Sequence, residues 1–341
     1  MPPDTIALAP IRAKHLPRFR RAPLEERPAF RLTDRDREGL KIIYENRWIT
    51  AEMLQDLLSP VKLTRRQQEA LDKLIAAKKA NAAGRETAER PQRTKREIRR
   101  RLQMLYHHGY VQRHKLSDGE SIAYALGNLG AEELTLYFGI DPKEIEWTTK
   151  NRESGERYIR HALMVTRFRH ALELALRNSP GAPLEFWKPG GAFKASVKYE
   201  DTVRTREGTR TQVVEGAVIP DGLFVVKVGE KRIHYFLEAD RSTMSNARYL
   251  AKLKSYFAFY ATYVRGGKKP SGITQMRVLS VTISEARKDN LRAIAQEVST
   301  EAKNLFWFAC EKEYRGKPHE VFGTIWQTLE DDTLKSLYVY G

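Results

Sequence analysis

The sequence predicts an α/β (α+β) protein built from two domains. The chain has 341 residues, of which 41% are hydrophobic, and this length exceeds what one ordinary core holds. Its pattern changes near residue 155. Before that point the chain shows helices and one hairpin, and after it a long helix, a run of adjacent strands and then alternating helices and strands. The second pattern indicates a domain with a mixed central sheet.

The expected domain limits follow from composition and from breaks in the periodic pattern. We expect a Pro-rich, basic and disordered arm over residues 1–30, an N-terminal domain over 31–140 and a C-terminal domain over 155–341. Within the N-terminal domain, residues 60–93 have a weak apolar pattern and indicate an insertion. Residues 141–154 are polar and indicate a linker.

The charge of the chain predicts a polyanionic partner. Lys and Arg number 60 against 43 Asp and Glu, a net charge of +17, which favours binding to nucleic acid through phosphate neutralisation. Between Arg85 and Lys115 there are ten basic residues and three acidic ones. Because no apolar run approaches the ~20 residues that a bilayer needs, we expect no membrane partner. The N-terminus lacks a secretory pattern, and Cys310 is the only cysteine, so we expect a cytoplasmic protein.

Three helices are expected at the start of the N-terminal domain. Thr33 is a candidate N-cap for the first and Thr50 for the second. The third, in TKREIRRRLQMLYHHG, begins with a T-x-x-E capping box at Thr94 and ends at Gly109. Its apolar residues follow helical spacing and form one buried edge. We expect the other faces of that helix to carry Lys95, Arg96, Arg99, Arg100 and Gln103.

The segment YVQRHKLSDGESIAYAL, after the third helix, predicts two strands around a tight turn. Three helices followed by a hairpin indicate a winged helix-turn-helix that binds double-stranded DNA, with the third helix in the major groove and the hairpin on flanking phosphates. A homodimer that binds two half-sites is also expected. The candidate DNA-binding residues are Lys95, Arg96, Arg99, Arg100, Gln103, Arg113 and Lys115. Two alternatives stay open: the arginines form a solvated helix face, or the module binds another protein.

The stretch PDGLFVVKVGEKRIHYFLEAD, residues 220–240, places acids around a predicted buried hairpin. A two-residue turn at Gly229-Glu230 places Asp221 opposite Glu238, with Cβ atoms about 4.5 to 5.5 Å apart. Asp240 lies on the same face if the strand continues. Like charges across a strand pair are destabilising unless a cation neutralises them. We therefore expect a site for Mg²⁺ or Mn²⁺ whose ligands are Asp221, Glu238 and Asp240.

Two resemblances follow from these residues. Pro220-Asp221 followed by Glu238-x-Asp240 resembles the PD-(D/E)xK motif of the restriction-endonuclease-like superfamily, which implies that fold for the C-terminal domain and a metal-dependent endonuclease or nicking activity. Roughly residues 30–310 resemble the replication-relaxation family, which implies a DNA-binding protein of plasmid or mobile-element replication and relaxation, with replication or mobilisation proteins as partners. The matching segments are LTDRDREGLKIIYENRWITAEML, HALMVTRFRHAL, PDG, LEADRST, AKLKSYFAFY, RVLSVTISEARKDNL and WF.

The chain departs from the nuclease pattern at one position. The motif expects a lysine where Asp240 stands, so we expect Lys252, rather than Lys254, to replace it. The superfamily also often uses a Glu on its first helix, for which Glu173 and Glu156 are candidates. The expected catalytic residues are Asp221, Glu238, Asp240 and Lys252.

Three alternatives to catalysis by these carboxylates remain. The acids form a structural cluster with Arg241 or a lysine, or the domain is a degenerate nuclease fold in a non-catalytic regulator or replication initiator. A tyrosine nucleophile is the third, although no HxH or HUH-like pair marks one. We expect His161 to be a core or DNA-facing residue rather than a metal ligand.

Overall fold

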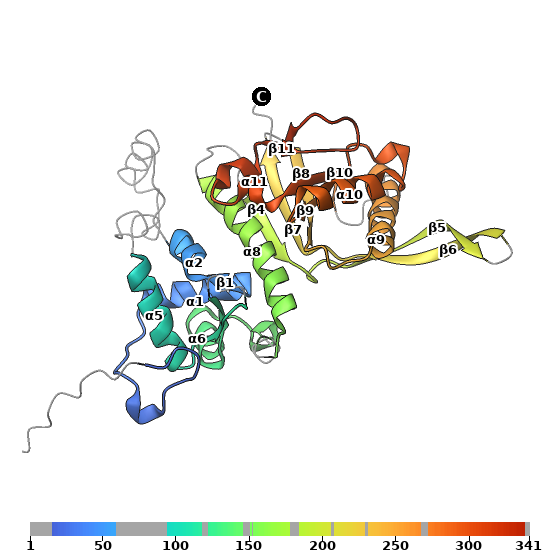
Figure 1. The fold of residues 1–341 in the computed structure, drawn as a ribbon. Coiled ribbons are helices and arrows are strands. Elements are labelled where there is room, and N and C mark those ends of the chain that lie inside the picture. Colours follow the sequence, from blue (N-terminus) through green and yellow to red (C-terminus); the bar gives the residue numbers. More distant parts are fainter. Residues whose placement is uncertain are drawn as a thin grey trace, which may run out of the picture. The chain divides into compact units, whose positions relative to one another are not determined.

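The computed structural model describes residues 16–58, 94–117, 122–145, 151, 153–177, 184–205, 208–228, 231–266 and 272–337 (Figure 1). These residues form two compact units. Unit 1 contains the described residues up to Glu156, and unit 2 contains those from Arg157 onward. The expected insertion at 60–93 and positions 118–120 of the expected hairpin turn at 117–120 lie outside the described residues. No helix in the described part of the chain is long and apolar enough to cross a membrane.

Unit 1 packs helices against a small antiparallel sheet. Its elements are α1 (Asp34–Asn46), β1 (Ile49–Thr50), α2 (Ala51–Leu58), α5 (Lys95–His107), β2 (Val111–His114), β3 (Ala123–Leu126) and α6 (Asn128–Phe138). The strand order is β1-β3-β2, and both pairings are antiparallel. The strand β1 was not expected, because two residues are too few to show an alternating pattern.

The helix starts expected from the sequence are confirmed. The Thr33 side chain accepts a hydrogen bond from the Asp36 backbone and begins α1. Thr94 and Glu97 form the expected capping box of α5, in which the Thr94 N–H donates to Glu97 Oε2 at 2.7 Å. The helix α5 stops before Gly109, whose φ of +86° suits a residue without a Cβ.

The expectation of a disordered arm over residues 1–30 needs a correction for residues 16–30. This segment includes a 3₁₀ turn at Leu24–Glu26 and is held against unit 1. Arg21 Nε donates to the Tyr106 carbonyl at 2.9 Å, and the Ala22 N–H donates to His107 Nδ1 at 3.1 Å. These partners are more than 80 residues away along the chain, so the local sequence gives no indication of them.

Unit 2 is built on a five-stranded mixed sheet. Its order is β10-β9-β8-β7-β4, in which β10, β9 and β8 are parallel and β8, β7 and β4 are antiparallel. The expected mixed α/β architecture is therefore confirmed. The strands are β4 (Leu184–Pro189), β5 (Ala195–Thr205), β6 (Gly208–Val218), β7 (Gly222–Val228), β8 (Lys231–Asp240), β9 (Gln275–Thr282), β10 (Phe306–Cys310), β11 (Thr324–Trp326) and β12 (Lys335–Ser336). The helices are α8 (Glu156–Arg177), α9 (Asn246–Phe259), a π-helical turn (Tyr260–Arg265), α10 (Glu285–Gln296) and α11 (Glu311–Tyr314).

Helices cover both faces of this sheet. On one face α8 packs through Phe168 against Phe224 and Tyr235. On the other face α9 packs through Tyr256 against Phe236, together with α10. Strand side chains alternate between the two cores because successive residues point to opposite faces. Burial on both faces explains why β8 has an almost continuous buried run.

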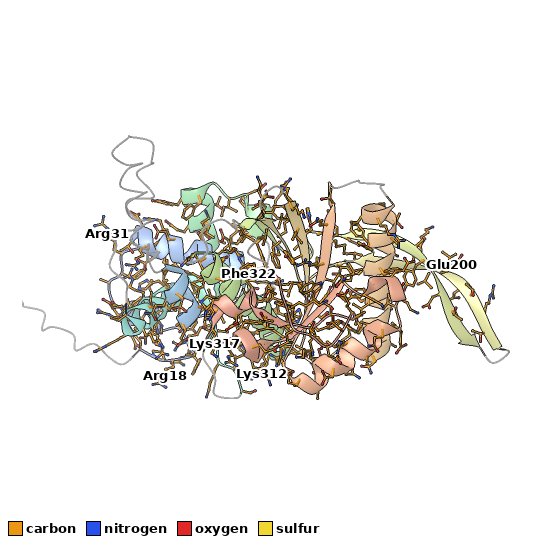
Figure 2. All side chains as sticks on the ribbon, turned by 90° about the horizontal axis from the view of Figure 1, so that it is seen from above. Arg18, Arg31, Glu200, Lys312, Lys317 and Phe322 are labelled. Atoms are coloured by element: carbon orange, nitrogen blue, oxygen red, sulfur yellow. The ribbon has the colours of Figure 1, made fainter. Side chains whose placement is uncertain are left out.

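The strands β5 and β6 form a separate two-stranded ribbon. They pair along their whole length, from Ala195 opposite Val218 to Thr205 opposite Gly208. Only the base of the ribbon packs on α9, and the part around Glu200 extends away from the sheet of unit 2 (Figures 1 and 2). The sequence predicts both strands but not their separation from the main sheet.

One buried ion pair holds α5 against α1. Arg101 Nε donates to Asp36 Oδ1 at 3.0 Å, and the Asp36 side chain is 1% exposed. Burial alone would raise the pKa of Asp36, but hydrogen bonds from Arg101 and Thr33 outweigh it and lower that pKa below its usual value. The Arg101 guanidinium also lies 4.4 Å from the centre of the Phe30 ring.

We predict that Arg101→Ala lowers the free energy of unfolding by about 3 kcal/mol, because it leaves the Asp36 carboxylate buried without its cation. Because the pKa of Asp36 is depressed, the charged carboxylate stabilises the fold above about pH 4, and this stabilisation is lost as the pH falls. Arg101→Ala lacks this stabilisation, so the variant should also unfold at a higher pH during acid titration. The matched control is exposed Arg100→Ala, which removes the same charge. Equal stability of the two variants in urea titrations would contradict this role of Arg101.

Candidate functional site

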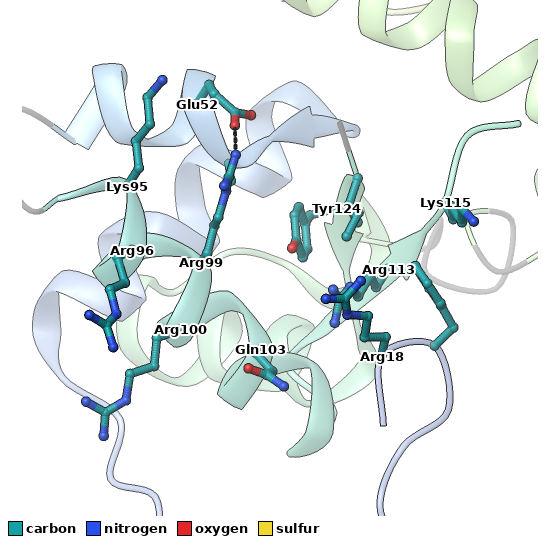
Figure 3. A pocket seen from close by; sticks show the side chains of 13 residues that line it. Arg18, Glu52, Lys95, Arg96, Arg99, Arg100, Gln103, Arg113, Lys115 and Tyr124 are labelled. Atoms are coloured by element: carbon teal, nitrogen blue, oxygen red, sulfur yellow. Dashed lines mark hydrogen bonds and ion pairs between the residues drawn. The ribbon is translucent and has the colours of Figure 1, made fainter. Parts of the chain in front are cut away.

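A basic depression on unit 1 contains every candidate DNA-binding residue (Figure 3). Lys95, Arg96, Arg99, Arg100 and Gln103 of α5 and Arg113 and Lys115 of the hairpin segment all line it. Other lining residues are Arg18, Phe19, Ala51, Glu52, Ile122 and Tyr124. Among the described lining residues, seven are cationic and one is acidic. We call this surface the basic depression.

Packing of α5 forces its cations into the basic depression. Ile98, Leu102 and Leu105 recur at helical spacing and are buried in the core of unit 1. Arg101 turns inward to Asp36, and the other cationic residues of α5 leave from the opposite edge of the helix. Figure 3 shows Lys95, Arg96, Arg99 and Arg100 along that edge.

The only acid lining the basic depression, among the described residues, is already paired. Arg99 donates to Glu52 Oε1 at 2.6 Å. Burial alone would raise the pKa of Glu52, but the hydrogen bond from Arg99 helps to lower it. Glu52 thus stays charged and neutralises one arginine, and the other cations keep a positive surface.

A second candidate site lies at the end of the β7–β8 hairpin in unit 2. The strands pair with Val228 opposite Lys231 and Gly222 opposite Leu237, which is the register expected from the sequence. The turn residues Gly229 and Glu230 lie outside the described residues. One step beyond the pairing, the Asp221 N–H donates to the Leu237 carbonyl at 2.8 Å. Asp221 and Glu238 are therefore brought to the same end of the hairpin.

Glu238 is buried and bonded to two side chains of α9. Lys252 Nζ donates to Glu238 Oε2, and the Tyr256 hydroxyl donates to Oε1. Burial raises the pKa of Glu238 to about 7, against the opposing effect of the Lys252 ammonium. Burial lowers the pKa of Lys252, but attraction to Glu238 and Asp221 outweighs it and the net shift is upward. Lys252 therefore stays charged near neutral pH.

Asp221 contacts a histidine from α8. His161 Nε2 lies 3.1 Å from Asp221 Oδ1, and Asp221 Oδ2 accepts a hydrogen bond from the Ala239 N–H at 2.8 Å. The hydrogen bond to Asp221 raises the pKa of His161. Burial would raise the pKa of Asp221, but His161 and Lys252 outweigh it and lower that pKa. The site thus contains His161, which the sequence predicts to be a core or DNA-facing residue.

Asp240, the third expected metal ligand, is engaged by a different partner. Arg287 of α10 donates to Asp240 Oδ2 from Nη2 at 2.7 Å and from Nε at 3.1 Å. The Ser242 N–H donates to Oδ1. Among the described residues, no group of three His, Cys, Asp or Glu side chains is placed to hold a metal ion. Asp221 and Glu238 are oxygen donors of the kind that a hard divalent ion takes, and each carboxylate oxygen keeps a second lone pair.

The structure also places the other residues considered for this site. Lys254 pairs with Asp201 of β5, whereas Lys252 pairs with Glu238. Glu173 pairs with Arg169 at 2.7 Å, and Glu156 accepts a hydrogen bond from the Ser117 hydroxyl at 2.6 Å. On α8, the side chain that meets Asp221 belongs to His161. His161 is the first residue of the segment HALMVTRFRHAL, but only the docking of α8 shows that it meets Asp221.

Comparison with known families identifies a matching family. A sequence model described as replication-relaxation matches residues 81–272, more than half of the 341 residues. The chain belongs to the replication-relaxation family. No curated protein and no solved structure matches the chain.

The replication-relaxation match covers parts of both candidate sites. It includes α5 and β2 of the basic depression, and it also includes the strands and helix that carry Asp221, Glu238 and Lys252. All seven candidate DNA-binding residues and Asp221, Glu238 and Lys252 thus lie within the matched segment, whereas Arg18, Phe19, Ala51 and Glu52 of the basic depression lie before it.

We predict that Asp221→Asn lowers the pKa of His161, because the amide cannot stabilise the imidazolium as a carboxylate does. In the wild-type protein the raised pKa stabilises the fold below about pH 6.5, and this contribution is lost as the pH rises through the folded pKa. An NMR titration of the histidine side chains measures the pKa of His161 in the wild-type protein and in the variant. An unchanged His161 titration in the variant would show that the pair does not form.

Proposed function

We propose that unit 1 is a winged-helix module that binds double-stranded DNA through the basic depression. The observation that carries this proposal is the convergence of all seven candidate residues on one surface. The order helix, strand, helix, helix and two strands is that of a winged helix, and it supports the assignment. Cationic side chains that lie close together repel one another, and a bound polyanion neutralises this repulsion.

The exposed edge of α5 is the element that enters the major groove in this proposal. That groove is about 12 Å wide and admits one helix. Gln103 and the arginines of α5 that line the depression reach base edges and phosphates, and Arg113 and Lys115 contact the flanking backbone. Membership of the replication-relaxation family supports a role in the replication or relaxation of plasmid or mobile-element DNA.

We predict that Arg100→Ala weakens DNA binding and reduces the slope of log K against log salt concentration by about 1, because one phosphate contact is lost. Fluorescence anisotropy with a labelled duplex at several salt concentrations measures both. The control is Lys41→Ala, an exposed lysine of α1 in the same unit that lies outside the basic depression.

Equal effects of Arg100→Ala and Lys41→Ala would mean that charge anywhere on the protein drives binding. A wild-type protein that binds no duplex would favour the alternative in which unit 1 binds another protein. Either result contradicts the proposed interface.

A second function, phosphodiester cleavage in unit 2, is supported by one specific arrangement. The β7–β8 register brings Asp221 to Glu238, and Lys252 contacts Glu238 from α9. Two acids at one end of a hairpin and a lysine that contacts one of them are the groups that a PD-(D/E)xK-like nuclease site requires, here with the lysine supplied by a helix. We propose that Asp221 and Glu238 are the ligands of Mg²⁺ or Mn²⁺, and that Asp240 instead anchors α10 through Arg287.

The reaction in this proposal is hydrolysis of one DNA strand. A bound divalent ion supplies Lewis-acid stabilisation of charge on the phosphate. Lys252 places a fixed positive charge beside the carboxylates, and His161 orients Asp221 through its hydrogen bond. Water attacks phosphorus and releases one proton to solvent, the bond from phosphorus to the leaving sugar oxygen breaks, and that oxygen takes up a proton from solvent.

We predict that the wild-type protein converts supercoiled plasmid to the open circular form only with Mg²⁺ or Mn²⁺. Asp221→Asn, Glu238→Gln and Lys252→Ala should each reduce the nicking rate by at least about 100-fold, the scale of losing one electrostatic group at a reacting phosphate. Agarose gels give the rate.

The matched control is Lys254→Ala, which removes a lysine two positions away that pairs with Asp201 instead. DNA binding that persists without cleavage under any divalent ion would leave the alternative, a degenerate nuclease fold in a non-catalytic regulator or initiator. Nicking that survives Glu238→Gln would exclude this site as its source.

A further inference from the structure

An exposed aromatic ring lies within the basic depression. Phe19 is 46% exposed and lines the same surface as the cations of α5 and the hairpin. Its chain neighbour Arg18 lines that surface too (Figure 3). A half-exposed phenyl ring among cations is not explained by burial in the core. Such rings are typical of surfaces that stack on nucleobases.

The position of Phe19 is set by the fold of unit 1. Two residues later, Arg21 donates to the Tyr106 carbonyl at 2.9 Å and to the Val111 carbonyl at 3.3 Å. The next backbone N–H, that of Ala22, donates to His107 Nδ1 at 3.1 Å. These bonds tie the arm to the end of α5 and the start of β2. Phe19 is therefore presented to the depression by a backbone that is already anchored.

Two cations of the hairpin segment lie against the Phe19 ring. The guanidinium carbon of Arg113 is 5.2 Å from the ring centre, and Lys115 Nζ is 5.9 Å from it. Both distances are within cation–π range. The ring and the two cations thus form one composite surface, which we call the Phe19 platform.

Arg113 also has unused hydrogen-bonding capacity. Its Nε and Nη1 atoms are buried and have no hydrogen-bond partner within the described part of the chain. Buried donors without a partner are uncommon, because each costs free energy until an acceptor satisfies it. A small rotation of the Arg113 guanidinium toward a phosphate or base oxygen beside the Phe19 ring would satisfy them. The platform therefore offers an aromatic face and charged donors at the same point.

We infer that the Phe19 platform binds an unpaired nucleobase next to the duplex that α5 occupies. This inference rests on the proposed binding of DNA by unit 1 and adds its preferred substrate, a duplex with an unstacked or unpaired base. Stacking requires a base whose face is free, which a fully paired duplex does not offer without distortion. Arg113 and Lys115 hold the phosphates on either side of that base.

The test compares two labelled duplexes of the same sequence, one fully paired and one with a bulge of two unpaired thymines, by fluorescence anisotropy with the full chain. We expect the wild-type protein to bind the bulged duplex roughly tenfold more tightly, the low end for stacking one base. Phe19→Leu should abolish this preference and keep the affinity for the paired duplex. Phe19→Trp should retain the preference, because it restores an aromatic face.

The control is Leu24→Ser, a residue of the same arm that is 75% exposed and does not line the depression. It should bind both duplexes as the wild-type protein does. A second measurement places 2-aminopurine in the bulge, where stacking on Phe19 should quench its fluorescence in the wild-type protein but not in Phe19→Leu. Urea titrations of each variant confirm that the arm still folds.

The results separate this inference from the proposal on which it rests. Equal binding of both duplexes by the wild-type protein would overturn the inference and leave duplex binding in place. A bulge preference that survives Phe19→Leu would also overturn it, as would an equal loss of affinity for both duplexes in that variant. Failure of the wild-type protein to bind either duplex would overturn the proposed function and the inference together.

Discussion

The burial of one edge of α5 determines where the cations of unit 1 can lie. Ile98, Leu102 and Leu105 pack into the core, and each buried side chain of this kind contributes about 1.5 to 3 kcal/mol. Arg101 is drawn inward to Asp36, and the remaining cations can only leave from the opposite edge. The hydrophobic effect thus assembles a surface whose charges repel each other. The core holds that surface ready for a polyanion.

Unit 2 contains the opposite arrangement, acids held among buried groups. Glu238 is desolvated enough for its pKa to reach about 7, although Lys252 contacts it. Replacing such a group by an apolar residue is often neutral or stabilising, so a buried ionic cluster is weak evidence for a purely structural role. Strong pKa shifts of this origin are concentrated at functional sites. The His161–Asp221 pair extends the cluster to α8, and the proposed chemistry therefore depends on packing from both faces of the sheet.

Local rules account for what could be predicted from the sequence. The capping box at Thr94 and the register that brings Asp221 to Glu238 follow from neighbouring residues and turn geometry, and both are confirmed. Contacts between distant segments could not be predicted in this way. The docking of residues 16–30 on unit 1, the pairing of Asp240 with Arg287 and the meeting of His161 with Asp221 each depend on tertiary packing. No periodicity or spacing in the chain encodes these three contacts.

The central claim is that DNA occupies the basic depression of unit 1. Chemical-shift mapping tests it most directly, with arginine Nε–Hε and backbone resonances of the labelled protein followed as a short duplex is added. The account predicts that the largest changes fall on Arg96, Arg100 and Arg113, with little change at Arg101, whose guanidinium is held by Asp36. Changes that are absent from α5 and the hairpin, or that concentrate on another face of unit 1, would contradict it.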